Sequence, residues 1–260
     1  MMTCLAIDLK KLTRRKDIWI GICILIAIPL LFSYFTAADS DFIEVGDSVF
    51  SGAAYIMGSL GLIRMLFIFY IFIILHASLL IAQEIDKGIL PMYKVKAKGR
   101  MPILFSHFTA LILLTLLLYL VSTGAGAAGW QLFLRGTEHG TTSFADASDD
   151  VNAVCFFFIA SAFMECLILA AFTGLASLFL KFNQTLMAAF AFLLFQKGLE
   201  RIKPIQAWIP SYLGEAKNLF DLTGDEIAHR ATLNLIILTV YFLILLGLAL
   251  LRFRKMDLIR

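Results

Sequence analysis

Long apolar runs without charged side chains constrain this sequence more than any other feature. The first of them, residues 18–35, contains 18 consecutive residues with no Asp, Glu, Lys or Arg. A helix that crosses the hydrocarbon core of a bilayer needs about 20 mostly apolar residues. Of the 260 residues, 60% are hydrophobic, which exceeds the roughly 45–50% that is typical of soluble domains. The sequence therefore predicts an all-α membrane protein.

Six transmembrane helices are expected, in a single transmembrane domain that covers residues 1–260. The fifth span is the weakest, because its fully apolar stretch, LMAAFAFLLF, covers only about half a bilayer. The expected spans are residues 18–36, 55–83, 102–128, 153–180, 182–196 and 231–251.

Charge is divided unequally between the connections of these spans. The N-terminal segment, the connections after the second and fourth spans and the C-terminal tail together hold 15 of the 22 Lys and Arg residues, with five acidic residues. The opposite connections hold six basic residues and 13 acidic ones. Lys and Arg concentrate in the cytoplasmic connections of membrane proteins. Both termini are therefore expected in the cytoplasm.

The N-terminal segment, residues 1–17, has an amphipathic pattern with leucines at helical spacing and basic residues around them. This pattern predicts a helix that lies in the cytoplasmic interface and contacts membrane lipid. A basic flank that only sets the orientation of the first span explains the same residues equally well. The residues that define the interfacial helix are Leu5, Leu9, Leu12, Arg14 and Arg15.

Two ionisable residues lie inside the expected spans, Arg64 in the second and Glu165 in the fourth. Counted from Glu84 and Lys181, they lie 20 and 16 residues along a helix, about 30 and 24 Å from the cytoplasmic boundary. Both therefore fall toward the outer leaflet, where pairing would lower the cost of burying either charge. Three interpretations follow: a polar feature of a translocation route, a structural ion pair, or Arg64 extending to the outer interface.

Sequence motifs for nucleotide hydrolysis and for metal-dependent chemistry are absent. Neither GxxxxGK[ST], HExxH nor GxSxG occurs, and GAGAAG at residues 124–129 ends a span instead of following a strand. The four cysteines show no spacing typical of a metal site or a disulfide framework. We therefore expect no catalytic residue, no metal site, no cofactor bound by this chain and no nucleic-acid partner.

The connection after the second span, residues 84–101, carries an unusual amount of charge. Acidic residues come first, glycine and proline then interrupt the backbone, and alternating cations follow. This composition suits a short segment that contacts the polar surface of another protein, and it also suits a solvated loop. The residues that we single out are Glu84, Asp86, Lys87, Gly88, Leu90 and Lys94.

With these features the sequence resembles the ABC-2 type permeases, the membrane subunits of bacterial ABC exporters. The likeness rests on the lead-in LKKLTRRKDIW, on the pattern Glu-x-x-Lys-Gly-x-Leu that begins at Glu84, on KGRMPILFSHF, and on the closing LRFRKMDL. A short fifth span followed by the polar segment QKGLERIKPIQAWIPSYLGEAKNLF adds to it. The positions of Pro91 and Pro102 depart from the family pattern.

The resemblance implies a permease of the bacterial cell membrane that dimerises with an identical or homologous chain. Two copies of a separate ABC ATPase, which binds ATP and Mg, would contact the six singled-out residues of the 84–101 connection. Residues 197–217 would form an outer re-entrant segment between the fifth and sixth spans. Its marker residues are Pro204, Trp208 and Tyr212.

The expected cargo is an apolar or amphipathic substrate, such as a peptide toxin, an antimicrobial peptide or a drug, moved out of the cell. A glycan- or lipid-exporting ABC permease is the nearest alternative. Two other classes stay open: a six-span intramembrane enzyme that uses His76, Glu84 or Glu165, and an immunity or scaffold protein without transport activity.

Overall fold

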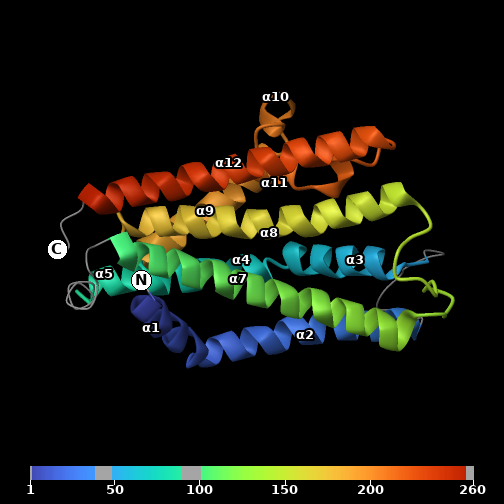
Figure 1. The fold of residues 1–260 in the computed structure, drawn as a ribbon, viewed down its shortest axis with the longest axis horizontal. Coiled ribbons are helices and arrows are strands. Elements are labelled where there is room, and N and C mark those ends of the chain that lie inside the picture. The colour runs from blue at the N-terminus through green and yellow to red at the C-terminus, as the bar shows by residue number, and fades with distance from the viewer. Residues whose placement is uncertain (1, 39–48, 90–100, 256–260) are drawn as a thin grey trace.

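The computed structural model describes residues 2–38, 49–89 and 101–255, and in these ranges the chain is a bundle of long helices without strands (Figure 1). One isolated β-bridge joins Phe50 to Gly140. Five helices are long and apolar enough to cross a membrane, so the chain is a multi-pass membrane protein. These five are Lys16–Ala37, Ile68–Asp86, Met101–Leu134, Asp149–Ser177 and Asp225–Lys255.

The described helices follow one another along the chain. They are α1 (Met2–Thr13), α2 (Lys16–Ala37), α3 (Gly52–Met65), α4 (Ile68–Leu80), α5 (Ala82–Asp86), α7 (Met101–Gly129), the π-helical turn η1 (Trp130–Leu134), α8 (Asp149–Ser177), α9 (Phe182–Leu199), α10 (Lys203–Gln206), α11 (Pro210–Leu213), the 3-10 turn η2 (Ala216–Asn218) and α12 (Asp225–Lys255).

Local sequence explains several helix ends. The side chains of Ser51 and Ser148 accept hydrogen bonds from the backbone N–H groups of Ala54 and Val151, and thereby cap α3 and α8. Helix α12 has two acidic residues in its first turn and three basic residues in its last, an arrangement that complements the helix dipole. The apolar runs predict long helices, and these caps and terminal charges suit the ends of the helices.

Helix α8 lies at the centre of the bundle. It packs against α3, α4, α7, α9 and α12, while α2 and α1 pack against α7. By contrast, α2 and α12 bury only small shares of their apolar windows, 28% and 17%. Their large exposed side chains, such as Trp19, Leu31 and Leu243, form faces suited to lipid or to another membrane-embedded surface.

The sequence predicts one span over residues 55–83, but the structure divides it into α3, α4 and α5. The first break falls at Phe67, whose φ of +58° lies in the left-handed region, where non-glycine residues are strained. No proline or glycine lies between α3 and α4, so ordinary helix-breaking residues do not mark this position. Figure 1 shows α3 and α4 in succession along the length of α7.

The fifth predicted span corresponds to α9, which begins at Phe182 as expected. It has 18 residues but is not among the five helices that are apolar and long enough to cross a membrane, because Asn183, Gln184 and Lys197 make its two ends polar. The chain then runs through α10, which projects beyond α12 in Figure 1, and returns through α11. Ser161, near the middle of α8, donates a hydrogen bond of 2.8 Å to the carbonyl of Gly214. The segment that was predicted to be re-entrant therefore contacts helix α8 of the bundle at Gly214.

The start of α1, the end of α12 and helix α5 lie at the same end of the bundle (Figure 1). The connection of residues 138–148 and the beginning of α12 lie at the other end. Two groups of polar side chains are buried between these ends, one beside the Phe67 break and one where α1, α5 and α7 meet.

Candidate functional site

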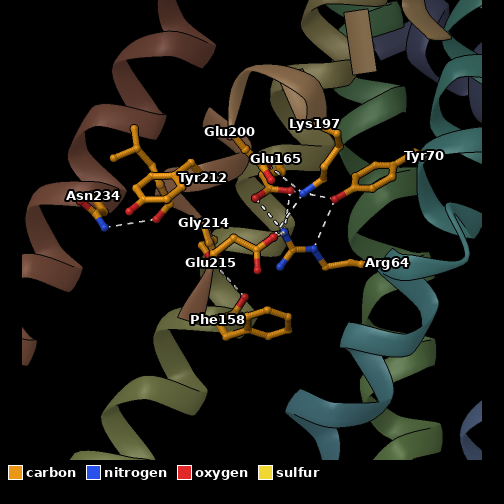
Figure 2. Close-up of polar contacts among 12 residues, drawn as sticks. Arg64, Tyr70, Phe158, Glu165, Lys197, Glu200, Tyr212, Gly214, Glu215 and Asn234 are labelled. Atoms are coloured by element: carbon orange, nitrogen blue, oxygen red, sulfur yellow. Dashed lines mark hydrogen bonds and ion pairs between the residues drawn. The ribbon is translucent and has the colours of Figure 1, made fainter. Parts of the chain in front are cut away.

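A buried ion pair joins the second and fourth predicted spans. Nη2 of Arg64 lies 2.8 and 2.9 Å from the two carboxylate oxygens of Glu165, and both residues are 7% exposed. The two ionisable residues predicted inside the spans thus contact each other (Figure 2). Pairing lowers the cost of burying each charge among apolar helices.

Tyr70 extends this pair across the break at Phe67. Its hydroxyl donates a hydrogen bond of 2.7 Å to Glu165 and lies 3.3 Å from Nε of Arg64, which donates to it. Arg64 belongs to α3 and Tyr70 to α4, so Glu165 of α8 holds both sides of the broken helix. The guanidinium also lies over the ring of Phe158, 4.7 Å from its centroid, a favourable cation–π distance.

Three charged residues beyond the predicted pair complete this cluster. Lys197, near the end of α9, lies 2.9 Å from a carboxylate oxygen of Glu200 and 3.2 Å from one of Glu215. The same Glu215 oxygen lies 3.7 Å from Arg64. From the sequence these three residues were placed in an outer connection, and the contact of Glu215 with Arg64 was missed. The i, i+3 spacing of Lys197 and Glu200 was a signal for one pair.

A cavity of about 420 Å³ lies against this cluster. Its volume is within the range of roughly 300–1,000 Å³ that is typical of small-molecule sites. Apolar and aromatic side chains form most of the wall, with charge at one part of it. The lining residues are Gly61, Arg64, Met65, Phe67, Tyr70, Phe158, Lys197 and Glu215.

The backbone of the returning segment is held by side chains from two long helices. Ser161 of α8 donates to the carbonyl of Gly214, Asn234 of α12 to that of Leu213 at 3.2 Å, and Tyr241 of α12 to that of Trp208 at 2.8 Å. Non-helical backbone at membrane depth is tolerated only when its polar groups find partners in protein or water. These bonds supply such partners.

Gly214 is required where this segment touches the ion pair. A Cβ atom at position 214 would lie 2.2 Å from Oε1 of Glu165, so Gly214→Ala must displace the carboxylate that Arg64 and Tyr70 hold. We expect a loss of about 1–3 kcal/mol in the free energy of unfolding, as for other overpacked interiors. Gly198→Ala is the matched control, because an added Cβ there meets nothing within 4 Å. Equal loss in both variants, measured by unfolding in bicelles, would contradict this assignment.

The second buried cluster lies where α1, α5 and α7 meet. Asp8 of α1 is fully buried; it accepts a short hydrogen bond from Ser106 and lies 3.0 Å from Nδ1 of His107. The other imidazole nitrogen lies 3.7 Å from Glu84, which pairs with Lys11 at 2.5 Å. Glu84 was predicted to contact a partner ATPase, but it is only 5% exposed and takes its contacts within this chain.

Asp8 is ionised in this environment. Burial raises its pKa, but the hydrogen bonds from His107 and Ser106, together with the nearby charges, outweigh burial and hold the pKa below the ordinary aspartate value. With a carboxylate at Asp8, Nδ1 of His107 is the donor of that hydrogen bond. Nothing in the sequence links residues 8 and 107, so only the fold reveals this contact.

The remaining predicted coupling residues are exposed or lie outside the described ranges. Asp86 accepts a hydrogen bond of 2.7 Å from the backbone N–H of Phe182 at the start of α9, while Lys87 and Gly88 are exposed. Gly88 has a φ of +63°, which explains why glycine ends α5. Leu90 and Lys94 lie outside the described residues.

The predicted interfacial helix forms as α1, and its leucines pack on the bundle. Leu12 is buried in the core, and Leu5 and Leu9 are partly buried against it. Part of the leucine stripe that was predicted to contact lipid therefore packs against the protein. Arg14 is exposed. Arg15 forms an exposed ion pair with Asp17 at 2.9 Å.

The marker residues of the outer segment differ in exposure. Pro204 lies in the first turn of α10 and is exposed, and Trp208 is 68% exposed, as expected of residues at an interface. Tyr212 is half-buried in α11, and its ring lies 5.5 Å from the ammonium of Lys217.

The three residues considered for an intramembrane enzyme have different partners. His76 lies 2.7 Å from the carbonyl oxygen of Phe72 and 3.5 Å from Asp17, whereas Glu84 contacts Lys11, and Glu165 contacts Arg64. Among the described residues, no group of three or more His, Cys, Asp and Glu side chains is arranged to hold a metal ion. Glu84 and Glu165 thus lie in charge pairs, whereas His76 contacts a backbone carbonyl.

No family model matches the chain, and no curated protein matches it.

Proposed function

We propose that this chain is the membrane subunit of an ATP-driven exporter of the ABC-2 type. In this proposal it crosses the bacterial cell membrane six times, with α9 as the short fifth span, and keeps both termini in the cytoplasm. It dimerises with an identical or homologous chain and docks on a separate ATPase subunit. That subunit binds ATP and Mg, since this chain contains no P-loop.

The cluster of Lys11, Glu84, His107 and Asp8 carries this proposal. It joins α1, α5 and α7 at the base of the 84–101 connection. A connection attached to three helices through buried charges passes a displacement to all of them, whereas a loose loop would absorb it. That is the property needed at a point where a motor subunit pushes on a membrane subunit.

The broken second span gives the same displacement a route toward the cavity. Helices α5 and α4 run from Glu84 to the break at Phe67, where Tyr70 contacts Glu165. Packed side chains with discrete arrangements respond to a push by switching rather than by bending. We propose that motion of α4 changes how Glu165 and Glu215 share Arg64, and so opens or closes the cavity.

The lining of the cavity supports an apolar or amphipathic cargo. Met65, Phe67 and Phe158 provide apolar and aromatic surface, and charge is confined to one side. A glycan needs hydrogen-bonding groups along its whole path, whereas the side chains of Met65, Phe67 and Phe158 in this wall offer none. Export of a peptide or of an apolar drug is therefore preferred over glycan export.

Co-purification of the full chain from native membranes tests the function. An ABC ATPase is expected to elute with it, and ATP turnover of the complex is expected to fall about tenfold in Lys87→Glu, because a single interface charge is worth roughly 1–2 kcal/mol. Lys203→Glu is the matched control, because it reverses an exposed charge elsewhere in the chain, at the start of α10. Isolation of the chain without any nucleotide-hydrolysing partner, or full turnover in Lys87→Glu, would argue against the proposal.

A further inference from the structure

We infer that the cavity beside the Phe67 break binds a small amphipathic cation, a ligand with an ammonium group on an apolar chain. This inference rests on the proposed function, because it names the chemical class of cargo that the exporter would hold. It is carried by the charge balance of the cluster and by the composition of the cavity wall.

The charged cluster at the cavity contains one more carboxylate than cations. Arg64 and Lys197 face the three carboxylates of Glu165, Glu200 and Glu215 at distances of 2.8 to 3.7 Å. When all five are ionised, the cluster carries a net charge of −1. Unbalanced charge among apolar helices is costly, so a bound cation stabilises this arrangement.

Of the three carboxylates in the cluster, that of Glu215 lines the cavity, together with Arg64 and Lys197. Both protein cations approach its Oε1 atom, and no described residue donates a hydrogen bond to its second oxygen. The Glu215 side chain is 27% exposed and lines the cavity, while Glu165 and Glu200 do not line it. An ammonium group in the cavity can therefore donate to Glu215 without breaking either existing contact.

The remaining wall suits the apolar part of such a ligand. Phe67 and Met65, on either side of the break, and Gly61 offer surface without charge. Arg64 already occupies the face of Phe158, so the ligand's chain has Phe67 and Met65 for its packing. An anion in the cavity would lie beside the carboxylate of Glu215 and would compete with the three carboxylates of the cluster for Arg64 and Lys197.

Equilibrium dialysis with the full chain in lipid nanodiscs tests this inference. Octylamine, octanol and octanoate share one alkyl chain and differ in head-group charge, and empty nanodiscs correct for partition into lipid. We expect octylammonium to bind about tenfold more tightly than octanol, the ratio that corresponds to roughly 1.4 kcal/mol for one charge-assisted hydrogen bond. Octanoate should bind no better than octanol.

Two variants locate the site. Glu215→Gln removes the surplus charge and leaves two cations facing two carboxylates, so the fold should persist while the preference for octylammonium disappears. Glu226→Gln removes one negative charge from the exposed first turn of α12 and should leave binding unchanged. Thermal unfolding of both variants separates loss of the site from loss of the fold.

A peptide could supply the same ammonium group through a lysine side chain. N-acetyl-Leu-Lys-Leu-amide carries that group between two apolar side chains, so comparing it with octylamine shows whether the cavity accepts a backbone. Tighter binding of the peptide assigns the cation to a peptide, and tighter binding of octylamine assigns it to a small amine.

Equal affinity for octylammonium and octanol, or unchanged binding in Glu215→Gln, would overturn the inference. Neither result bears on the exporter proposal, since binding is measured without an ATPase. Conversely, preferential binding of octylammonium by a chain that co-purifies with no ATPase would support the site and remove the exporter proposal.

Discussion

Arg64→Met is expected to lower the free energy of unfolding by about 3–5 kcal/mol, because it leaves Glu165 as a buried carboxylate without its cation. In the structure Glu165 is 7% exposed, and its carboxylate oxygen Oε1 lies 2.8 Å from Nη2 of Arg64. Tyr70 remains as a donor but carries no charge. The double variant Arg64→Met/Glu165→Leu should recover most of this loss, because it removes both charges and keeps apolar volume. Unfolding by detergent titration in bicelles measures the energies of Arg64→Met, of Glu165→Leu and of the double variant.

An exposed pair provides the control for this cycle. Arg15 and Asp17 form an ion pair of 2.9 Å, with side chains about one third exposed. Arg15→Met should therefore cost no more than about 1 kcal/mol. If Arg64→Met and Glu165→Leu act additively, the two residues are not energetically coupled, and the buried pair does not stabilise the break at Phe67.

Glu84→Lys is expected to have the second large effect, on the joint between α1, α5 and α7. The new ammonium would face Lys11 and His107 at a position that is 5% exposed. We expect a loss of about 3 kcal/mol in stability, and the proposed complex with an ATPase should lose ATP-dependent transport. The charge-swapped variant Lys11→Glu/Glu84→Lys restores the attraction and should recover part of both.

Transport measured against ATP turnover separates two roles of this joint. If Glu84 transmits motion, the proposed complex that carries Glu84→Lys should hydrolyse ATP through its ATPase subunit without moving cargo, and the complex with the charge-swapped chain should regain transport. A charge-swapped chain that is as defective as Glu84→Lys, although it folds, would show that the Lys11 contact is unimportant for coupling. Asp86→Asn offers a comparison, since Asp86 is exposed and contacts only the start of α9 among the described residues.

The contact between Arg64 and Glu165 was the most predictable feature of the candidate site. Each is an ionisable residue in an apolar span, and such residues find partners because the alternative is costly. The break in the second span was less predictable. It falls at Phe67, where no glycine or proline marks it, and contacts on both sides of the break compensate for the strained backbone.

The burial of Glu84 could not be predicted from the sequence. In the sequence it belongs to a charged connection and resembles a surface contact. In the structure α1 folds back against α7 and buries it beside Lys11 and His107. Burial depends on which distant segment covers a residue, and a local pattern of charge does not contain that information.

That this chain is a helical, multi-pass membrane protein could be predicted from its sequence, because apolar character and helix length are properties of consecutive residues. Which charges meet is a property of the tertiary structure. Arg64 and Glu165 are separated by 101 residues and Asp8 and His107 by 99, and their contacts depend on helix packing. Apolar character sums over a run of consecutive residues, whereas an ion pair requires two side chains to be brought within a few ångströms of each other.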